Sequence, residues 1–215
     1  MTSTPTPPRR PVTAGDLDQA FQLAVTTLRQ APISHWDKLA DHLEWTCWET
    51  VEHVCDLVSY AFQLGLSKPL LDASMPLART SRRPGAPASA VHVDRAAGPD
   101  GLLLVLEATG ALLAAMVRTR SPLVRAYHPY GISDPEGFAA MGITEALVHT
   151  HDVAQSLALS WTPSVDMCSR VLDRLFPAAP PGADSWATLL WATGRRELSG
   201  HRRLTAWRWD CYVRL

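Results

Sequence analysis

Apolar side chains recur at steps of three or four residues along four long stretches of this chain, which is the spacing that one face of an α-helix requires. The third stretch is rich in Leu and Ala on several sides, as is typical of a central helix. The fourth begins with Ser133 three residues before Glu136, which predicts a capping box. Four helices of this length favour a mainly α protein built as a four-helix bundle. The predicted helices are residues 13–30, 46–66, 100–120 and 133–160.

The chain beyond the fourth predicted helix has a different pattern. Residues 164–176 and 184–197 predict two further helices, and residues 204–213 (LTAWRWDCYV) alternate enough to predict a terminal strand. We therefore expect a short C-terminal helical and strand appendage at 161–215, packed on the bundle.

Two other segments complete the predicted organisation. Residues 1–11 are Pro-rich and predict a flexible tail, so we expect the helical bundle to span 12–160. Within it, residues 67–99 form a long irregular loop that carries several arginines. A loop of this length often covers a site, although its composition equally suits a solvated or disordered connection.

Charge and cysteine spacing exclude several classes of protein. The formal net charge is −1, so the basic surplus of a nucleic-acid binder is missing. The longest apolar run, 102–117, is interrupted by Glu107 and is shorter than the roughly 20 residues that span a bilayer. The N-terminus lacks the apolar core of a secretory signal, and the 4 cysteines form no C-x-x-C pair. We expect a cytoplasmic protein with buried, reduced thiols and no membrane partner.

The segment TEALVHTHD, residues 144–152, concentrates groups that can bind a cation. At about 100° per residue, Glu145, His149 and Asp152 fall on one stripe of a helix, whereas His151 points to the opposite side. A carboxylate and an imidazole at i and i+4 can share one cation. The alternative is an ordinary surface pair, which this spacing produces more often.

A third ligand has to come from another helix. His53 is the natural candidate because it lies in the second predicted helix, at the border of its apolar stripe. Three protein ligands leave a fourth position open, which is typical of a catalytic zinc site. Asp152 is then either an orienting carboxylate for a ligand or a structural hydrogen-bond partner.

The chain resembles the DinB-like superfamily, and within it actinobacterial proteins similar to the N-terminal domain of mycothiol-dependent maleylpyruvate isomerase. The most specific elements are W-x-x-x-x-H at 48–53 and E-x-x-x-H-x-x-D at 145–152. The resemblance implies a DinB-like four-helix bundle with a divalent metal, often zinc, held by His53, Glu145 and His149. The chain departs from that family after residue 160, because only a short appendage follows where the isomerase has a separate α/β domain. The resembling segments are residues 43–54, 101–117, 131–159 and 174–195.

What the resemblance implies is a metal-dependent S-transferase or isomerase that uses a low-molecular-weight thiol, mycothiol, on a small electrophile, working as a monomer or homodimer. The alternatives are a hydrolase that uses metal-bound water, a metal-binding or sensing bundle without turnover, and a helical bundle without metal. Arginines of the long loop are candidates for contacting an anionic substrate, although solvated surface side chains are the more common explanation for such a group. These arginines are Arg79, Arg82, Arg83 and Arg95.

Overall fold

Helices make up most of the regular structure of this chain, as the spacing of its apolar residues predicts. The computed structural model describes residues 9–182 and 184–213, and in this part of the chain the strands form a single two-stranded antiparallel hairpin. The helices are α1 (Ala14–Leu28), α2 (Cys47–Cys55), α3 (Val58–Gly65), α4 (Gly98–Thr119), α5 (Pro135–Leu157), α6 (Val165–Leu175) and α7 (Ser185–Ala192). Two short 3₁₀ turns lie at Ile33–His35 and Arg95–Ala97, and the strands are β1 (Ala126–His128) and β2 (Gly131–Ser133).

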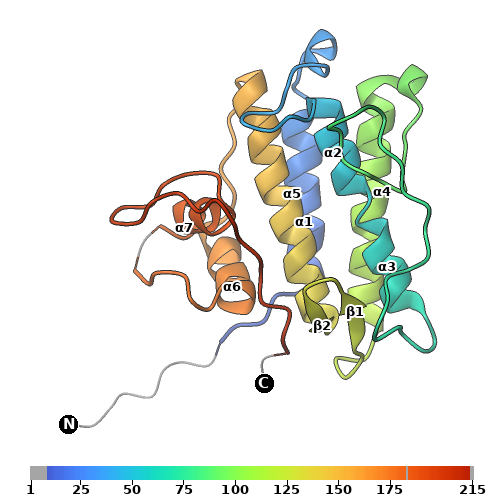
Figure 1. The fold of residues 1–215 in the computed structure, drawn as a ribbon, viewed down its shortest axis with the longest axis vertical. Coiled ribbons are helices and arrows are strands. Elements are labelled where there is room, and N and C mark those ends of the chain that lie inside the picture. The colour runs from blue at the N-terminus through green and yellow to red at the C-terminus, as the bar shows by residue number, and fades with distance from the viewer. Residues whose placement is uncertain (1–8, 183, 214–215) are drawn as a thin grey trace.

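The first five helices run side by side along the longest axis of the molecule (Figure 1). α1 packs against α4 and α5, α2 packs against the same two helices, and α3 continues the contact with α4. α5 is almost completely buried, although it carries the polar stripe described above. α1 and α4 approach so closely that a Cβ at Gly110 would stand 2.3 Å from the ring of Phe21.

The second predicted helix is interrupted. α2 ends at Cys55, and α3 begins at Val58. Between them the backbone tightens into i→i+3 hydrogen bonds, such as Asp56 N to His53 O at 3.1 Å. The Asp56 carboxylate there accepts hydrogen bonds from the backbone of residues 90 and 91, at 2.7 and 3.1 Å. The prediction of one continuous helix over 46–66 is therefore wrong. The periodic pattern could not show the interruption, because it depends on contacts with a distant segment of the chain.

The fourth predicted helix is confirmed, but its cap differs from the prediction. Ser133 belongs to β2, and the N-cap is Asp134, which accepts a hydrogen bond from Gly137 N at 2.8 Å. At the other end Ala158 adopts a left-handed conformation with φ 53°, so α5 stops three residues before the predicted 160.

The C-terminal part forms helices α6 and α7 and then an irregular segment. α6 packs on α5 and α7 packs on α6, so both lie beside α5 in Figure 1. The strand predicted at 204–213 does not form, because this stretch finds no partner strand and lies as an extended segment bonded by Asp210 N to Leu175 O at 2.8 Å. The helix predicted at 184–197 ends earlier, at Ala192.

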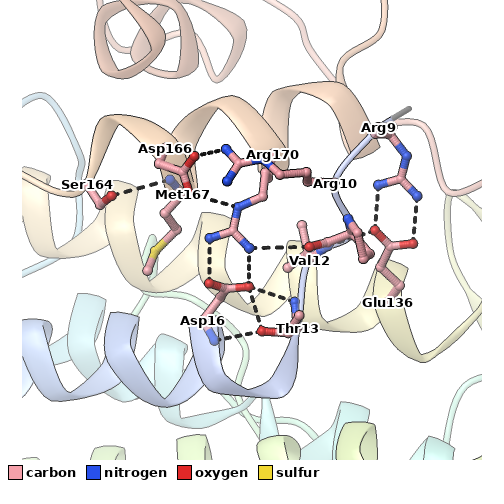
Figure 2. A network of polar contacts seen from close by, with 11 residues as sticks. Arg9, Arg10, Val12, Thr13, Asp16, Glu136, Ser164, Asp166, Met167 and Arg170 are labelled. Atoms are coloured by element: carbon pink, nitrogen blue, oxygen red, sulfur yellow. Dashed lines mark hydrogen bonds and ion pairs between the residues drawn. The ribbon is translucent and has the colours of Figure 1, made fainter. Parts of the chain in front are cut away.

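Ion pairs join the N-terminal part of the described chain to α5 and α6 (Figure 2). The Arg170 guanidinium of α6 donates to both carboxylate oxygens of Asp16 in α1, each at 2.6 Å. Arg9 pairs in the same bidentate way with Glu136 at the start of α5, at 2.5 and 2.7 Å. Of the predicted flexible tail 1–11, residues 1–8 lie outside the described part of the chain. Arg9 is held in place by its contact with Glu136.

The long loop between α3 and α4 is held along α2 by arginine–carboxylate pairs. The carboxylates are buried and belong to Glu49 and Glu52 of α2 and to Asp56, the residue that caps its C-terminus. They meet Arg83, Arg82 and Arg79 of the loop respectively. The loop therefore runs along α2 with its chain direction antiparallel to that of the helix. The fourth arginine, Arg95, pairs with Asp37 and lies 4.3 Å from the ring centroid of Trp48.

The stretch Arg95–Thr119, which contains α4, is long and apolar enough to cross a membrane by length and composition. The sequence argument from Glu107 and the short apolar run missed this, because the helix extends beyond that run at both ends. Of the apolar window, 39% is buried inside the protein, and the core helix of a folded domain passes the same test. In the structure α4 packs against α1, α2, α3 and α5.

Candidate metal centre

Three donors predicted from the sequence come together between α2 and α5. His53, Glu145 and His149 each offer one ligand atom, and these atoms all lie within 4.8 Å of one another. The Glu145 Oε2 atom stands 3.0 Å from His149 Nε2 and 3.7 Å from His53 Nε2. The two imidazole rings are 5.3 Å apart and nearly perpendicular, at 86°. Both nitrogens and the carboxylate oxygen therefore converge on one small volume.

The contact between Glu145 and His149 is close, but it does not satisfy the carboxylate oxygen by hydrogen-bond geometry. Glu145 Oε2 is buried and has no hydrogen-bond partner, although His149 Nε2 is at hydrogen-bonding distance. An unsatisfied buried oxygen costs on the order of 1–3 kcal/mol, more when it is charged. Donors that approach without aligning to one another are what a bound cation requires, so the residues fit a divalent metal.

Electrostatics keep the carboxylate ionised and one imidazole neutral. Burial would raise the pKa of Glu145, but contact with His149 and the charges of His53 and Arg195 outweigh it and bring the pKa to about 2. Burial also lowers the pKa of His53 to about 4, which leaves its ring neutral and able to donate a lone pair at neutral pH.

His149 differs from His53 because it has a buried anionic partner behind it. Its Nδ1 lies 3.1 Å from Asp152 Oδ2, one turn further along α5. Burial lowers the pKa of His149, but its close contacts with the carboxylates of Asp152 and Glu145 outweigh it and raise the pKa above its ordinary value. A carboxylate on Nδ1 fixes the ring orientation and presents Nε2 to the donor cluster. His53 Nδ1, in contrast, is buried without a partner among the described residues.

Asp152 is held in turn by an arginine from the C-terminal segment. Arg195 Nη2 donates to Asp152 Oδ2 at 2.9 Å, and the Asp152 and Arg195 side chains are 0% and 6% exposed. Gly194 turns the chain directly after α7, because its φ of 71° lies in the left-handed region that a helix cannot continue through. After this turn Arg195 N donates a hydrogen bond to Leu190 O at 2.7 Å, and the Arg195 side chain reaches Asp152. Arg195 is thus a buried residue of the site, although an arginine in a C-terminal appendage is ordinarily expected at the surface. Its partner lies 43 residues away in the chain, and no local signal marks it.

The three donors open into a pocket of about 510 Å³. Its walls come from α2, α3, β1, α5 and the segment after α7. Trp45 stands at one wall, with its ring 4.9 Å from that of His53 and 5.9 Å from that of His149. Further aromatic walls come from residues that the sequence argument did not assign to the site. These are Tyr60, Tyr127, Tyr130, Phe138, Trp207 and Trp209.

Other sequence candidates lie elsewhere. His151 points away from the donors, as helical phase predicts, and its ring packs 5.5 Å from that of Trp186 in α7. Arg79 lines the pocket while pairing with Asp56. The remaining loop arginines, Arg82, Arg83 and Arg95, are not among the lining residues. His128, which is not among the residues predicted for the site, also lines the pocket.

The arrangement has three nitrogen and oxygen donors, an adjoining pocket and one ligand with a carboxylate behind it. A cation held in this way keeps a coordination position open toward the pocket, where it can bind a thiolate or water. Comparisons with family models, with curated proteins and with solved structures found no match for this chain.

Proposed function

We propose that His53, Glu145 and His149 bind one divalent metal ion, with zinc as the first choice, and that the protein transfers or isomerises small electrophiles with a metal-activated thiol. The observation that carries the metal proposal is the convergence of three ligand atoms within 4.8 Å, with one buried oxygen left unsatisfied. Two imidazoles and one carboxylate suit zinc and also other divalent transition metals.

Each residue of the proposed site has a distinct role. His53 and His149 would each supply one ring nitrogen, and Glu145 would supply the negative charge that offsets part of the cation's charge. Asp152 and Arg195 hold His149 in one orientation. The Trp45 ring lies against both imidazoles, 4.9 Å from that of His53 and 5.9 Å from that of His149, and limits how far the two rings can turn. When bound, the metal would lower the pKa of a thiol and hold it as a thiolate beside the electrophile.

The resemblance noted from the sequence supports the choice of a thiol and names mycothiol as its candidate. It also supports a finer description of the fold, in which α1, the α2–α3 pair, α4 and α5 form a DinB-like four-helix bundle. The mutual contacts of these helices are consistent with that description. The pocket of about 510 Å³ has room for a thiol and a small electrophile together.

The metal proposal is tested on protein purified without a histidine tag. Wild type is expected to hold about one equivalent of zinc, measured by elemental analysis and by competition with a chromophoric chelator. His149→Ala removes a donor and should weaken zinc binding by more than the roughly 10–100-fold that loss of an outer hydrogen bond costs. His151→Ala, two residues along the same helix, is the matched control. Equal zinc content in all three proteins would show that the ligands are wrongly assigned.

The thiol proposal needs a separate assay. Zinc-loaded wild type is incubated with mycothiol and a panel of small electrophiles, and consumption of the thiol is followed over time. Consumption should depend on the metal and be lost in His149→Ala. A protein that binds zinc stoichiometrically but consumes no thiol with any electrophile would be a metal-binding protein without this activity.

A further inference from the structure

Tyr60 and His128 form a second polar element in the wall of the same pocket. Tyr60 lies on α3 and His128 on β1, and both line the cavity into which the three donors open. The Tyr60 hydroxyl oxygen stands 3.2 Å from His128 Nε2. The proposed metal site does not use either residue.

The surroundings of His128 settle which ring nitrogen carries its proton. The backbone N–H of Tyr130 donates to His128 Nδ1 at 3.1 Å, so Nδ1 must hold a lone pair. The Cys211 thiol, 3.5 Å from the same nitrogen, is compatible with an acceptor there. Burial outweighs the charge of Glu145 and lowers the pKa of His128 to about 4, so the ring is neutral at neutral pH. The single ring proton is therefore on Nε2.

This tautomer fixes the role of the Tyr60 hydroxyl. Nε2–H of His128 donates to the phenolic oxygen, so that oxygen accepts and its own proton remains to be donated. No acceptor for that proton occurs among the residues that the structure describes. Burial and the charge of Glu145 raise the pKa of Tyr60 well above its ordinary value, so the proton is retained.

We infer that Tyr60 donates a hydrogen bond to an oxygen of the molecule bound beside the metal site, and that His128 is the positioning residue that directs this bond. The inference rests on the proposed metal site. This hydrogen bond selects ligands that present a carboxylate or carbonyl oxygen to Tyr60. A purely apolar thiol gains no binding energy from this residue.

The test uses two small probes on the full chain loaded with Co²⁺, whose absorption bands report ligand exchange. Acetate carries a second oxygen for Tyr60, and 1-propanethiol carries none. Tyr60→Phe keeps the ring that packs 5.3 Å from Phe138 and removes only the hydroxyl. It should weaken acetate binding about tenfold, the size of one hydrogen bond to a charged group, and leave propanethiol binding within about twofold. Tyr127→Phe, in the same wall, is the control and should change neither.

His128 is tested by substitution and rescue. His128→Ala should weaken acetate binding but not propanethiol binding, and His128→Gln should restore it because an amide N–H can donate to the phenolic oxygen. A structural role would instead reduce both probes alike, and that result overturns the inference, as does unchanged acetate binding in Tyr60→Phe. Wild type that takes up no cobalt refutes the metal proposal itself, and the inference falls with it.

Discussion

The Asp152 carboxylate offers the sharpest test of how this site is built into the fold. It is 0% exposed and accepts from His149 Nδ1 at 3.1 Å and from Arg195 Nη2 at 2.9 Å. Asp152→Asn preserves size and shape but replaces one oxygen by an NH₂ group that can only donate. Both donors contact the same oxygen, Oδ2, and Arg195 Nε lies 3.4 Å from the other oxygen, Oδ1. An asparagine can keep its carbonyl oxygen at the Oδ2 position, but its NH₂ group then faces Arg195 Nε, and Arg195 keeps its charge in a buried position without an anionic partner.

The cost follows from these contacts. Breaking a buried ion pair by removing one partner costs about 3–5 kcal/mol, because an uncompensated charge is left behind. A hydrogen bond retained by the asparagine returns about 1 kcal/mol. We therefore expect the free energy of unfolding of the metal-free protein to fall by about 2–4 kcal/mol.

The pH dependence has a definite sign. Burial would raise the pKa of Asp152, but the hydrogen bond with His149 and the charge of Arg195 outweigh it and bring it to about 2. The stabilisation by the ionised carboxylate is thus present above its ordinary pKa of about 3.9 and is lost as the pH falls toward 2. The pKa of His149 is raised, so its share is present below about 6.5 and is lost as the pH rises through the raised value.

Both contributions are present near pH 5.5, where the difference between wild type and Asp152→Asn should be largest. Urea unfolding of the metal-free proteins, with a chelator present, measures it at pH 5.5, 3 and 9. Asp18→Asn is the control, because Asp18 pairs with Arg118 at 2.6 Å but is 41% exposed and should lose less than about 1 kcal/mol. A loss for Asp152→Asn no larger than the control, at an unchanged denaturant slope, would refute the reasoning.

Two further predictions concern packing and thiol chemistry. Gly110→Ala should lower the free energy of unfolding by about 1–3 kcal/mol because the added methyl group meets Phe21, whereas Gly15→Ala, whose Cβ stands 3.6 Å from its nearest neighbour, should be neutral or raise it by up to about 1 kcal/mol. Urea titrations of both variants and of wild type measure these changes in the free energy of unfolding. An aromatic disulfide reagent should leave the cysteines of the native protein unmodified and react with all of them in denaturant, because burial raises each thiol pKa; rapid native modification would contradict the burial. The thiols are Cys47, Cys55, Cys168 and Cys211.

Periodic patterns predicted the helices because burial of one face leaves a local trace in the sequence. The bounds of α1, α4 and α6 fall within two residues of the predicted ranges. The interruption at Asp56 and the cap at Asp134 were missed because both depend on contacts from other segments. The predicted terminal strand failed for a related reason, since alternation describes a strand only when a partner strand is available.

The donor cluster was predictable because helical phase places Glu145 and His149 on one stripe. His53 needed a choice among helix faces, and its place beside Glu145 is a matter of tertiary packing. Arg195 and the Tyr60–His128 pair could not be found in this way, because their partners are distant in the chain and carry no spacing rule.

The pocket draws its donors and its outer wall from separate stretches of the chain. The donors come from α2 and α5, whereas Arg195, Trp207 and Trp209 come from the segment after α7. Substitutions at the two tryptophans can therefore reshape this wall of the pocket without altering any of the three donor side chains. The shape of the pocket and the identity of its donors can in this way change independently of each other, because they are encoded in stretches of the chain that lie far apart.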